Sequence, residues 1–269
     1  MSKVDIIITC YNQGILCKNT IESAINQNFQ DKNIIIVDDG SNDKQTLEIL
    51  NSYKDVPGIS VVHEKNSGVA HARNYGFSFG TSLYVVFLDG DDLLDPNFIN
   101  MTVNAIENYH AVMAYTYTKL FGTINHLWYL EKPSYKRLLT KNMIPLTCLV
   151  RREQVRKIGG FYEGFHEGIE DWDFWIRLLH EKDLVVRINR PLFLYRRQIV
   201  SRNTDLKKSS IHMEKMTSLI VEHNKEIYDK YSVGAIDIQR RNKQSFVSKI
   251  YRRIYYLIQT RKKISKFIL

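Results

Sequence analysis

The sequence has few cysteines, few prolines and no long apolar run, and each absence excludes a class of protein. Its three cysteines, Cys10, Cys17 and Cys148, are an odd number without a CxxC pair, which argues against a disulfide framework and a cysteine zinc site. Only 5 of 269 residues are proline and 44% are hydrophobic, which excludes a solvated low-complexity chain. We therefore expect a core large enough for one α/β domain with an appended lobe.

Apolar residues are also missing where a membrane anchor or a leader would need them. No uninterrupted apolar stretch reaches the length of about 18 residues that a membrane-spanning helix requires. The first residues, Met1 to Asp5, lack the apolar centre and the small-residue cleavage site of a signal peptide. The sequence therefore predicts a cytoplasmic protein.

Acidic residues are scarce at the end of the chain, where none follows Asp237. Residues 196–269 contain 18 Lys and Arg but six Asp and Glu, so this segment is strongly basic in a chain whose net charge is +9. From Phe246 the apolar residues recur at helical spacing, with basic residues outside that stripe. Such a helix binds an anionic membrane surface from the inner face, or packs on its own domain or on a second subunit of a homo-oligomer. A nucleic-acid-binding core is not indicated.

Short apolar runs alternate with helical patterns over the first hundred residues. We predict strands at 4–9, 34–37, 59–63 and 83–88, and helices at 20–27, 45–53 and 68–79. Near-continuously apolar strands separated by helices indicate a parallel sheet that is covered on both faces. In such sheets ligands bind beyond the carboxyl ends of the strands.

Two aspartate clusters lie at those strand ends. Asp38 and Asp39 follow the second strand, and Asp89 and Asp91 follow the fourth. Crowded carboxylates repel one another and lose hydration, so they need a cation or hydrogen-bond donors. Asp89 and Asp91 form a D-x-D pair whose oxygens suit Mg²⁺ or Mn²⁺. A solvated turn would give the same residues.

Three further side chains could recognise a nucleotide at this edge. Asp39 can accept a hydrogen bond from the N3–H of uracil while Tyr11 stacks on the base. Arg73, in a helix with a glycine at its start, can bind a diphosphate or a base. A turn at Asp39 and a solvated helical arginine are the structural alternatives.

The second half follows a less regular pattern. We predict a helix at 97–108, a strand at 111–121 with a hairpin partner at 126–130, and a basic helix at 135–141. A helix with acids in its first turn starts at Glu170, and two long helices follow at 206–231 and 236–265. The predicted organisation is a first half of the α/β domain at 1–95, a second half at 96–203 and a basic helical extension at 204–269.

Seven motifs in order, over about 200 residues, resemble the family 2 glycosyltransferases, which have the GT-A fold. The chain matches the family motifs T-x-Y-N at 9–12, I-V-D-D-G-S at 36–41, N-x-G-x-x-x-A-R-N-x-G at 66–76, F-L-D-x-D-D at 87–92, G-G-F-x-E at 159–163, E-D-x-D-x-W-x-R-L at 170–178 and Y-R-x-x-x-x-S at 195–201. The resemblance implies a Rossmann-like nucleotide-binding domain with a mostly parallel central sheet. It also implies that 1–95 is the nucleotide-sugar-binding half and that 96–203 is the acceptor-binding half with the catalytic base.

The resemblance also assigns roles to residues. It implies that the base is held by Thr9, Tyr11, Asp39 and Arg73, with Asp38 at the same corner, the ribose by Asp89, the metal by Asp91, and the diphosphate by Arg196 and Ser201. It places the catalytic base of inverting members at Asp171. We expect Glu170 to orient the acceptor or the base, and Trp172 to stack on an acceptor sugar.

The function that these features predict is a metal-dependent inverting transfer from a nucleotide sugar, most simply a UDP-sugar. The acceptor would be a glycan or a lipid-linked glycan in the synthesis of a surface or secreted polysaccharide. Gln198 replaces a histidine of many members, so the metal would rely on Asp91, the diphosphate and water. Two alternatives are a sugar nucleotidyltransferase, which should have a glycine-rich basic loop after the first strand, and a non-catalytic glycan-binding protein on the same scaffold.

Overall fold

The alternating pattern of the first half folds into strands and helices close to those predicted. The computed structural model describes residues 3–128, 133–165, 168–198 and 210–238. Its first half contains β1 (Val4–Cys10), α1 (Ile15–Ile25), β2 (Lys32–Asp39), α2 (Lys44–Asn51), β3 (Ile59–Glu64), α3 (Val69–Phe79), β4 (Tyr84–Asp89) and β5 (Leu93–Leu94). Helix α1 begins five residues earlier than predicted, directly after Gly14, whose backbone N–H donates to Thr46 Oγ1 on α2 at 2.8 Å.

The second half adds strands to the same sheet. It contains α4 (Phe98–Tyr109), β6 (Met113–Gly122), β7 (His126–Trp128), α5 (Tyr135–Leu138), β8 (Leu149–Arg151), α6 (Arg152–Lys157), α7 (Glu170–Leu178), β9 (Val185–Arg197), α9 (Ser210–His223) and α10 (Lys225–Tyr231). The long strand β9 has no counterpart among the predicted strands. Its proline, Pro191, lies where the pairing with β6 changes register, and proline is typical of such irregular positions.

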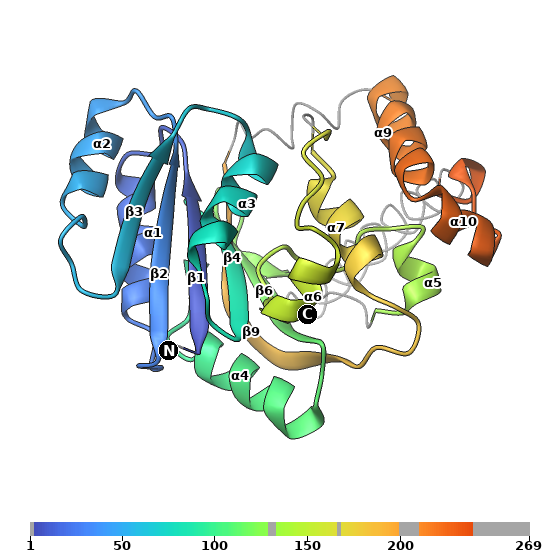
Figure 1. Ribbon diagram of the computed structural model, residues 1–269, viewed down its shortest axis with the longest axis horizontal. Coiled ribbons are helices and arrows are strands. Elements are labelled where there is room, and N and C mark those ends of the chain that lie inside the picture. The colour runs from blue at the N-terminus through green and yellow to red at the C-terminus, as the bar shows by residue number, and fades with distance from the viewer. Residues whose placement is uncertain (1–2, 129–132, 166–167, 199–209, 239–269) are drawn as a thin grey trace, which may run out of the picture.

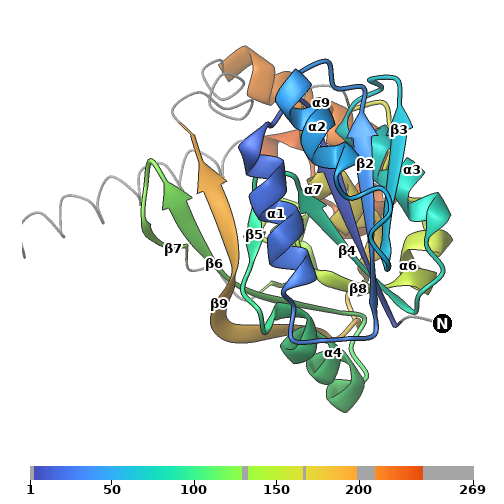
Figure 2. The same ribbon diagram turned by 90° about the vertical axis from the view of Figure 1, so that its left-hand side faces the viewer.

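The sheet has the order β3-β2-β1-β4-β8-β6-β9-β5, with β7 paired to β6. The strands β3, β2, β1 and β4 are parallel, as predicted, whereas β8 runs antiparallel to both β4 and β6. The two predicted halves therefore share one continuous sheet (Figure 1). The hairpin of β6 and β7 lies beside the end of β9, away from α3 (Figure 2).

Helices cover both faces of this sheet, as the apolar strands require. On one face, Ile6 and Ile8 of β1 belong to a core with Ile21 of α1 and Phe98 of α4. On the other face, Ile7 belongs to a core that includes residues of α3, α5, α6, α7, α9 and α10. Alternate residues of β1 thus enter different cores, which is the arrangement expected of a buried parallel strand.

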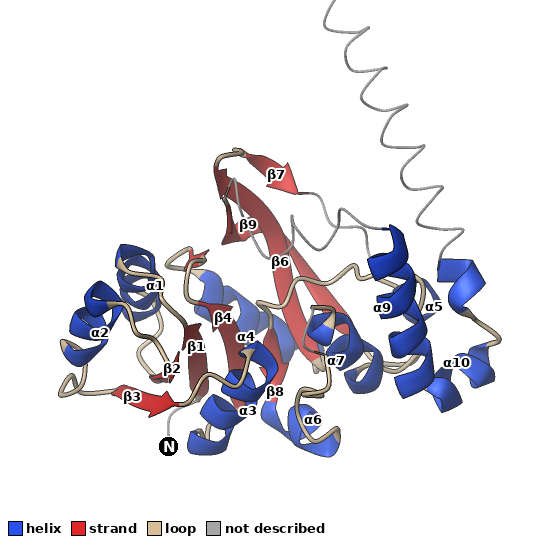
Figure 3. Ribbon diagram, turned by 90° about the horizontal axis from the view of Figure 1, so that it is seen from above, coloured by secondary structure: helices blue, strands red, loops and turns tan. Residues whose placement is uncertain are grey.

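The helical extension differs from the prediction of one helix over 206–231. Within the described part it is divided at Asn224 into α9 and α10, which lie beside α5 and α7 (Figure 3). The Asn224 amide donates to Asp173 of α7 at 2.8 Å and to the Ile220 carbonyl at 3.0 Å. A buried contact with α7 therefore outweighs continuation of the helix.

The basic amphipathic helix predicted from Phe246 lies outside the described residues. Among the described helices, none is long and apolar enough to cross a bilayer.

Candidate active site

The three polar segments predicted to converge do meet at the carboxyl ends of the parallel strands. In the sheet register, Thr9 of β1 pairs with Asp89 of β4, and Cys10 pairs with Asp38 of β2. The Gly90 N–H also donates to the Thr9 carbonyl at 2.9 Å. The first and fourth strands therefore end side by side, with both aspartate clusters at one edge.

The first aspartate of the β2 cluster shapes the turn that follows it. Asp38 is 2% exposed, and its carboxylate accepts the Ser41 N–H at 3.0 Å and lies 2.8 Å from His63 Nδ1. Both oxygens are thus bonded within the protein. Contact between Asp38 and the nucleotide stays a prediction. His63 of β3 was not identified from the sequence, because no motif includes it.

The second aspartate holds the loop that leads into α3. Asp39 accepts the backbone N–H groups of Ser67 at 2.8 Å and Gly68 at 3.2 Å. Gly40 has φ +73°, and a Cβ there would lie 2.5 Å from the Asn66 nitrogen, so only glycine fits between these two loops. Recognition of a base by Asp39 stays a prediction.

The loop after β1 presents an aromatic ring to solvent. Tyr11 is 47% exposed, whereas Thr9 is buried at the end of the strand. Between them and α1, Asn12 bonds to the turn after β2: its Oδ1 accepts the N–H groups of Asn42 at 2.8 Å and Asp43 at 2.9 Å. Asn12 thus fixes the loop, and the open Tyr11 ring is available for stacking.

Arg73 lies in a different environment from the one predicted. Its guanidinium is 3% exposed and donates to Asp89 Oδ1 at 2.7 Å and to Glu170 Oε1 at 3.0 Å. Burial disfavours its charge, but Asp89 and Glu170 outweigh this effect and hold the pKa of Arg73 above its usual value. Arg73 is thus paired with two carboxylates, and its predicted contact with the nucleotide stays a prediction.

Asp171 lies in the first turn of α7 and is positioned by two donors. Its Oδ2 accepts from the Asn142 amide at 2.9 Å, and its Oδ1 accepts the Trp172 N–H at 2.8 Å. Burial and the neighbouring charge of Glu170 raise the pKa of Asp171 to about 6, although Arg73 and the two donors act in the opposite direction. A carboxylate with such a pKa suits a general base near neutral pH. Asn142 was missed, since nothing in the loop after α5 marks it.

Glu170 precedes Asp171 and is 8% exposed. Its Oε1 accepts from Arg73 at 3.0 Å, while Oε2 is buried and has no hydrogen-bond partner among the described residues. Glu170 therefore lies between Arg73, which donates to it, and Asp171, whose pKa its charge raises.

Trp172, which was expected to face the site, has its ring in the core. The side chain is 6% exposed, and its indole N–H donates to the Leu138 carbonyl at 2.7 Å. Trp175 is fully buried as well. The Trp172 ring thus lies in the core, because α7 is covered by α5 and the helical extension, and stacking of an acceptor sugar on Trp172 stays a prediction.

The D-x-D turn holds three carboxylates of different kinds. Asp92 is buried and accepts the Arg196 N–H at 2.7 Å, which ties β9 to the turn. Burial and the charge of Asp89 raise the pKa of Asp91 to about 6, and the charge of Arg196 offsets this only in part. The Gln198 amide donates to Asp91 Oδ2 at 3.3 Å, beside the end of the turn.

The donor set at this turn fits a cation that a ligand helps to bind. Among the described residues, no three His, Cys, Asp or Glu side chains are grouped as a metal site. The Asp91 carboxylate offers an oxygen ligand whose negative charge is only partly balanced by the protein, and such a ligand suits Mg²⁺ or Mn²⁺. Both ions can keep water and phosphate as their other ligands. Arg196 donates from Nε to the Asp91 carbonyl at 2.8 Å. Ser201 lies outside the described residues.

A histidine between two glutamates ties the G-G-F-x-E loop to α3. His71 Nδ1 lies 2.9 Å from Glu163 Oε2, and His71 Nε2 lies 3.0 Å from Glu64 Oε2. Glu163 also accepts from the Asn74 amide at 2.8 Å. The hydrogen bond with Glu163 raises the pKa of His71. This clamp holds the loop against the helix that carries Arg73.

We expect the His71 clamp to stabilise the fold at acid pH and to weaken as the pH rises. Because its folded pKa is raised, its contribution is complete below the unfolded value of about 6.5 and is lost through the higher folded pKa. The stability difference between wild type and Glu163→Gln in urea unfolding should therefore shrink between pH 5 and 9. The exposed His126→Gln variant is the control, and a difference that stays constant with pH would contradict the clamp.

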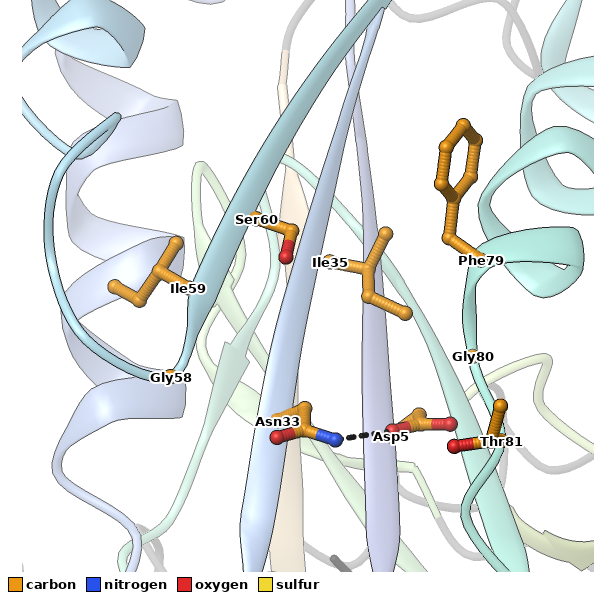
Figure 4. Close-up of a pocket in the computed structure, with 9 residues that line it drawn as sticks. All are labelled: Asp5, Asn33, Ile35, Gly58, Ile59, Ser60, Phe79, Gly80 and Thr81. Carbon is orange, nitrogen blue, oxygen red and sulfur yellow. Dashed lines mark hydrogen bonds between the residues drawn. The ribbon is translucent and has the colours of Figure 1, made fainter. Parts of the chain in front are cut away.

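A separate cavity of about 220 Å³ lies at the opposite edge of the sheet, near the amino ends of the strands (Figure 4). Asp5 and Asn33 line it and are joined by a hydrogen bond of 3.0 Å. The Asp5 carboxylate also accepts from Arg152 and Ser82. The Asp5 carboxylate is therefore satisfied by hydrogen bonds within the protein, and this cavity is distinct from the candidate active site.

Comparisons with known proteins agree with this geometry. The family model "Glycosyl transferase family 2" matches residues 5–165. Chondroitin synthase of Escherichia coli is 29% identical over 231 residues, which cover 81% of this chain and 32% of that protein. This chain thus spans about a third of that relative's length.

Solved structures show the same fold. Staphylococcus aureus TarS 1–349 in complex with UDP-GlcNAc has a TM-score of 0.69 at 18% identity, over 81% of this chain and 65% of that one. The mannosyltransferase PcManGT from Pyrobaculum calidifontis, in complex with GDP-Man and Mn²⁺, has a TM-score of 0.64 at 14% identity, over 82% and 64%. The predicted GT-A fold is confirmed. With a family match over more than half of its residues, this chain belongs to glycosyltransferase family 2.

Proposed function

We propose that this glycosyltransferase is a metal-dependent inverting enzyme that transfers a sugar from a nucleotide sugar, most simply a UDP-sugar, to a glycan or lipid-linked glycan. The observation that carries the proposal is the position of Asp171. It lies in the first turn of α7, next to Glu170, which Arg73 connects to Asp89 at the donor edge. A base with a pKa of about 6 is thus adjacent to the end of the strand where a nucleotide would bind.

Asp171 has the properties that an inverting transfer requires. An acceptor hydroxyl that hydrogen-bonds to its carboxylate would lose its proton to Asp171 as the oxygen attacks the anomeric carbon. The leaving nucleotide diphosphate departs on the opposite side, toward the D-x-D turn. A divalent cation held by Asp91 and the diphosphate would neutralise the leaving group. Asn142 keeps the Asp171 carboxylate oriented toward the acceptor.

The nucleotide half of the proposal rests on the open edge of the sheet. Tyr11 is exposed for stacking, and Asp89 has a 35% exposed side chain that can accept from a ribose hydroxyl. TarS, which binds UDP-GlcNAc, and PcManGT, which binds GDP-Man with Mn²⁺, share this fold with different bases. We favour uridine because Asp39 lies at the edge where it can pair with the N3–H.

The donor is tested by screening UDP-, GDP- and dTDP-sugars for Mn²⁺-dependent hydrolysis and for thermal stabilisation of the full chain. Ligand at a hundredfold excess over its Kd stabilises a protein by about 2.7 kcal/mol, which is readily measured. We expect a UDP-sugar to give both effects. Stabilisation by GDP alone would overturn the choice of base, and no turnover with any donor would overturn the proposed transfer.

Replacing Asp91 with alanine is expected to remove the Mn²⁺-dependent part of nucleotide binding. The variant deletes the carboxylate that offers the metal an oxygen ligand, so the metal and the diphosphate lose their common anchor. The measurement is the thermal shift produced by UDP with and without Mn²⁺. Asp31→Ala, an exposed change at the other end of β2, is the control. An undiminished Mn²⁺ effect in Asp91→Ala would place the metal elsewhere.

The polysaccharide pathway, the lipid-linked acceptor, the anionic membrane surface and the homo-oligomer stay predictions from the sequence. The membrane surface and the lipid-linked acceptor depend on the basic helix predicted from Phe246, which lies outside the described residues.

A further inference from the structure

Four charged side chains form a row between the donor edge and α7. In order they are Asp89, Arg73, Glu170 and Asp171, and they come from β4, α3 and the first turn of α7. Arg73 contacts Asp89 at 2.7 Å through one terminal nitrogen and Glu170 at 3.0 Å through the other. The fold therefore uses one arginine to connect two elements that are about eighty residues apart in sequence.

This row contains one cation and three carboxylates, and its two middle members, Arg73 and Glu170, are poorly hydrated. The side chains of Arg73 and Glu170 are 4% and 10% exposed. Arg73 Nε and Glu170 Oε2 are buried without hydrogen-bond partners among the described residues. Water cannot screen these charges well, so each one acts strongly on the next. The protonation of the last member, Asp171, is therefore sensitive to the other members.

The groups that face Asp171 act on it with opposite signs. Glu170, its neighbour on α7, disfavours the ionised form, whereas Arg73 from α3 favours it. Asn142 and the Trp172 N–H also favour the ionised form by hydrogen bonding. The Cys148 thiol, which is buried before β8, has its own pKa raised by burial and by Asp171, so it stays neutral. Arg73 is the cation that acts on Asp171 in this group.

We propose that Arg73 is a positioning residue that couples the donor edge to the catalytic base, by holding Asp89 with one nitrogen and Glu170 with the other. The inference rests on the proposed transfer reaction. Arg73 fixes the Glu170 carboxylate beside Asp171 and supplies the charge that keeps Asp171 ionised at neutral pH.

Coupling follows because Asp89 is shared. Its carboxylate is 35% exposed, so a ribose hydroxyl that donates to it competes with Arg73 for the same charge. When the ion pair between Asp89 and Arg73 weakens, the guanidinium interacts more strongly with Glu170. The negative charge of Glu170 then repels Asp171 less, which favours the ionised form of Asp171. Donor binding would thus prepare the base for the acceptor.

The test compares Arg73→Ala, Arg73→Lys and Glu170→Gln in the full chain through the pH dependence of kcat/KM. Loss of the arginine charge should move the acid limb of the profile to higher pH by about one pH unit, whereas loss of the glutamate charge should move it to lower pH. Lysine keeps the charge, so its limb should stay near that of wild type. Lys54→Ala, an exposed change beyond α2, should leave the profile unchanged.

The outcomes separate the inference from the proposed function. A carboxyl ¹³C NMR titration, with the Asp171 signal assigned from Asp171→Asn, reports the same shifts without turnover. Wild type that turns over no donor would overturn the transfer reaction, yet the titration would still test Arg73. The role of Arg73 would be overturned if neither the acid limb of the kcat/KM profile nor the Asp171 titration moved. This applies to Glu170→Gln and to whichever arginine variant folds.

Discussion

Replacing Asp171 with asparagine is expected to abolish sugar transfer while nucleotide binding is retained. Asparagine keeps the size of the side chain and can still accept from the Asn142 amide, but it cannot take a proton from the acceptor hydroxyl. Loss of a positioned general base costs about 10²- to 10⁴-fold in rate. The measurement is the rate of transfer from the donor identified by screening, together with the Kd of UDP from calorimetry.

The nucleotide and the catalytic base Asp171 occupy separate parts of the site, so Asp171→Asn should affect transfer and not UDP binding. Asp171 is bonded to Asn142 and to its own helix, whereas the donor edge consists of the ends of β1, β2 and β4. UDP affinity should therefore change less than twofold. Glu181→Gln, an exposed change beyond α7, is the control. A folded Asp171→Asn protein that no longer binds UDP would show that Asp171 serves the donor instead.

Most of the fold could be predicted because local pattern and tertiary structure agree in the first half. The strand runs that end at Cys10, Asp39 and Asp89 are buried on both faces, so their apolar residues mark them plainly. Their polar ends must then meet at one edge, whatever the details of packing. The start of α1 was less visible, since its first turn is fixed by a bond from Gly14 to Thr46 of another helix.

The sequence predicted less well which side chains of a helix face the site and which face the core. Trp172 was expected to face an acceptor sugar, but Trp172 and Trp175 are both buried. The reason is tertiary: Tyr228 of α10 donates to the Leu139 carbonyl at 2.8 Å, so the extension covers the helical layer around α5 and α7. Arg73 differs for the same reason, because its partners, Asp89 and Glu170, come from distant parts of the chain.

The two halves of the chain are joined at the other end of the sheet by a buried ion pair. Arg152 of α6 donates to Asp5 Oδ2 at 2.6 Å, and it also donates to the carbonyls of Ser82 and Phe77. The Asp5 and Arg152 side chains are 0% and 4% exposed. One arginine thus connects α6 with the start of β1 and the segment before β4.

Replacing Arg152 with methionine is expected to lower the free energy of unfolding by about 3–5 kcal/mol, because the Asp5 carboxylate would remain buried without its cation. For a chain of this size the loss corresponds to a fall in Tm of roughly 10 °C. The measurement is urea unfolding followed by circular dichroism. Arg156→Met, an exposed change on the same helix, should be within about 0.5 kcal/mol of wild type.

The charge of Asp5, more than the lost packing of Arg152, should account for this effect. The double variant Asp5→Asn with Arg152→Met removes the uncompensated carboxylate, and its amide oxygen can still accept from the Ser82 N–H. We therefore expect it to be more stable than Arg152→Met alone, which is the non-additivity of a directly interacting pair. If the two changes instead add, the destabilisation comes from lost contacts of the arginine, and the ion pair is not what joins α6 to β1.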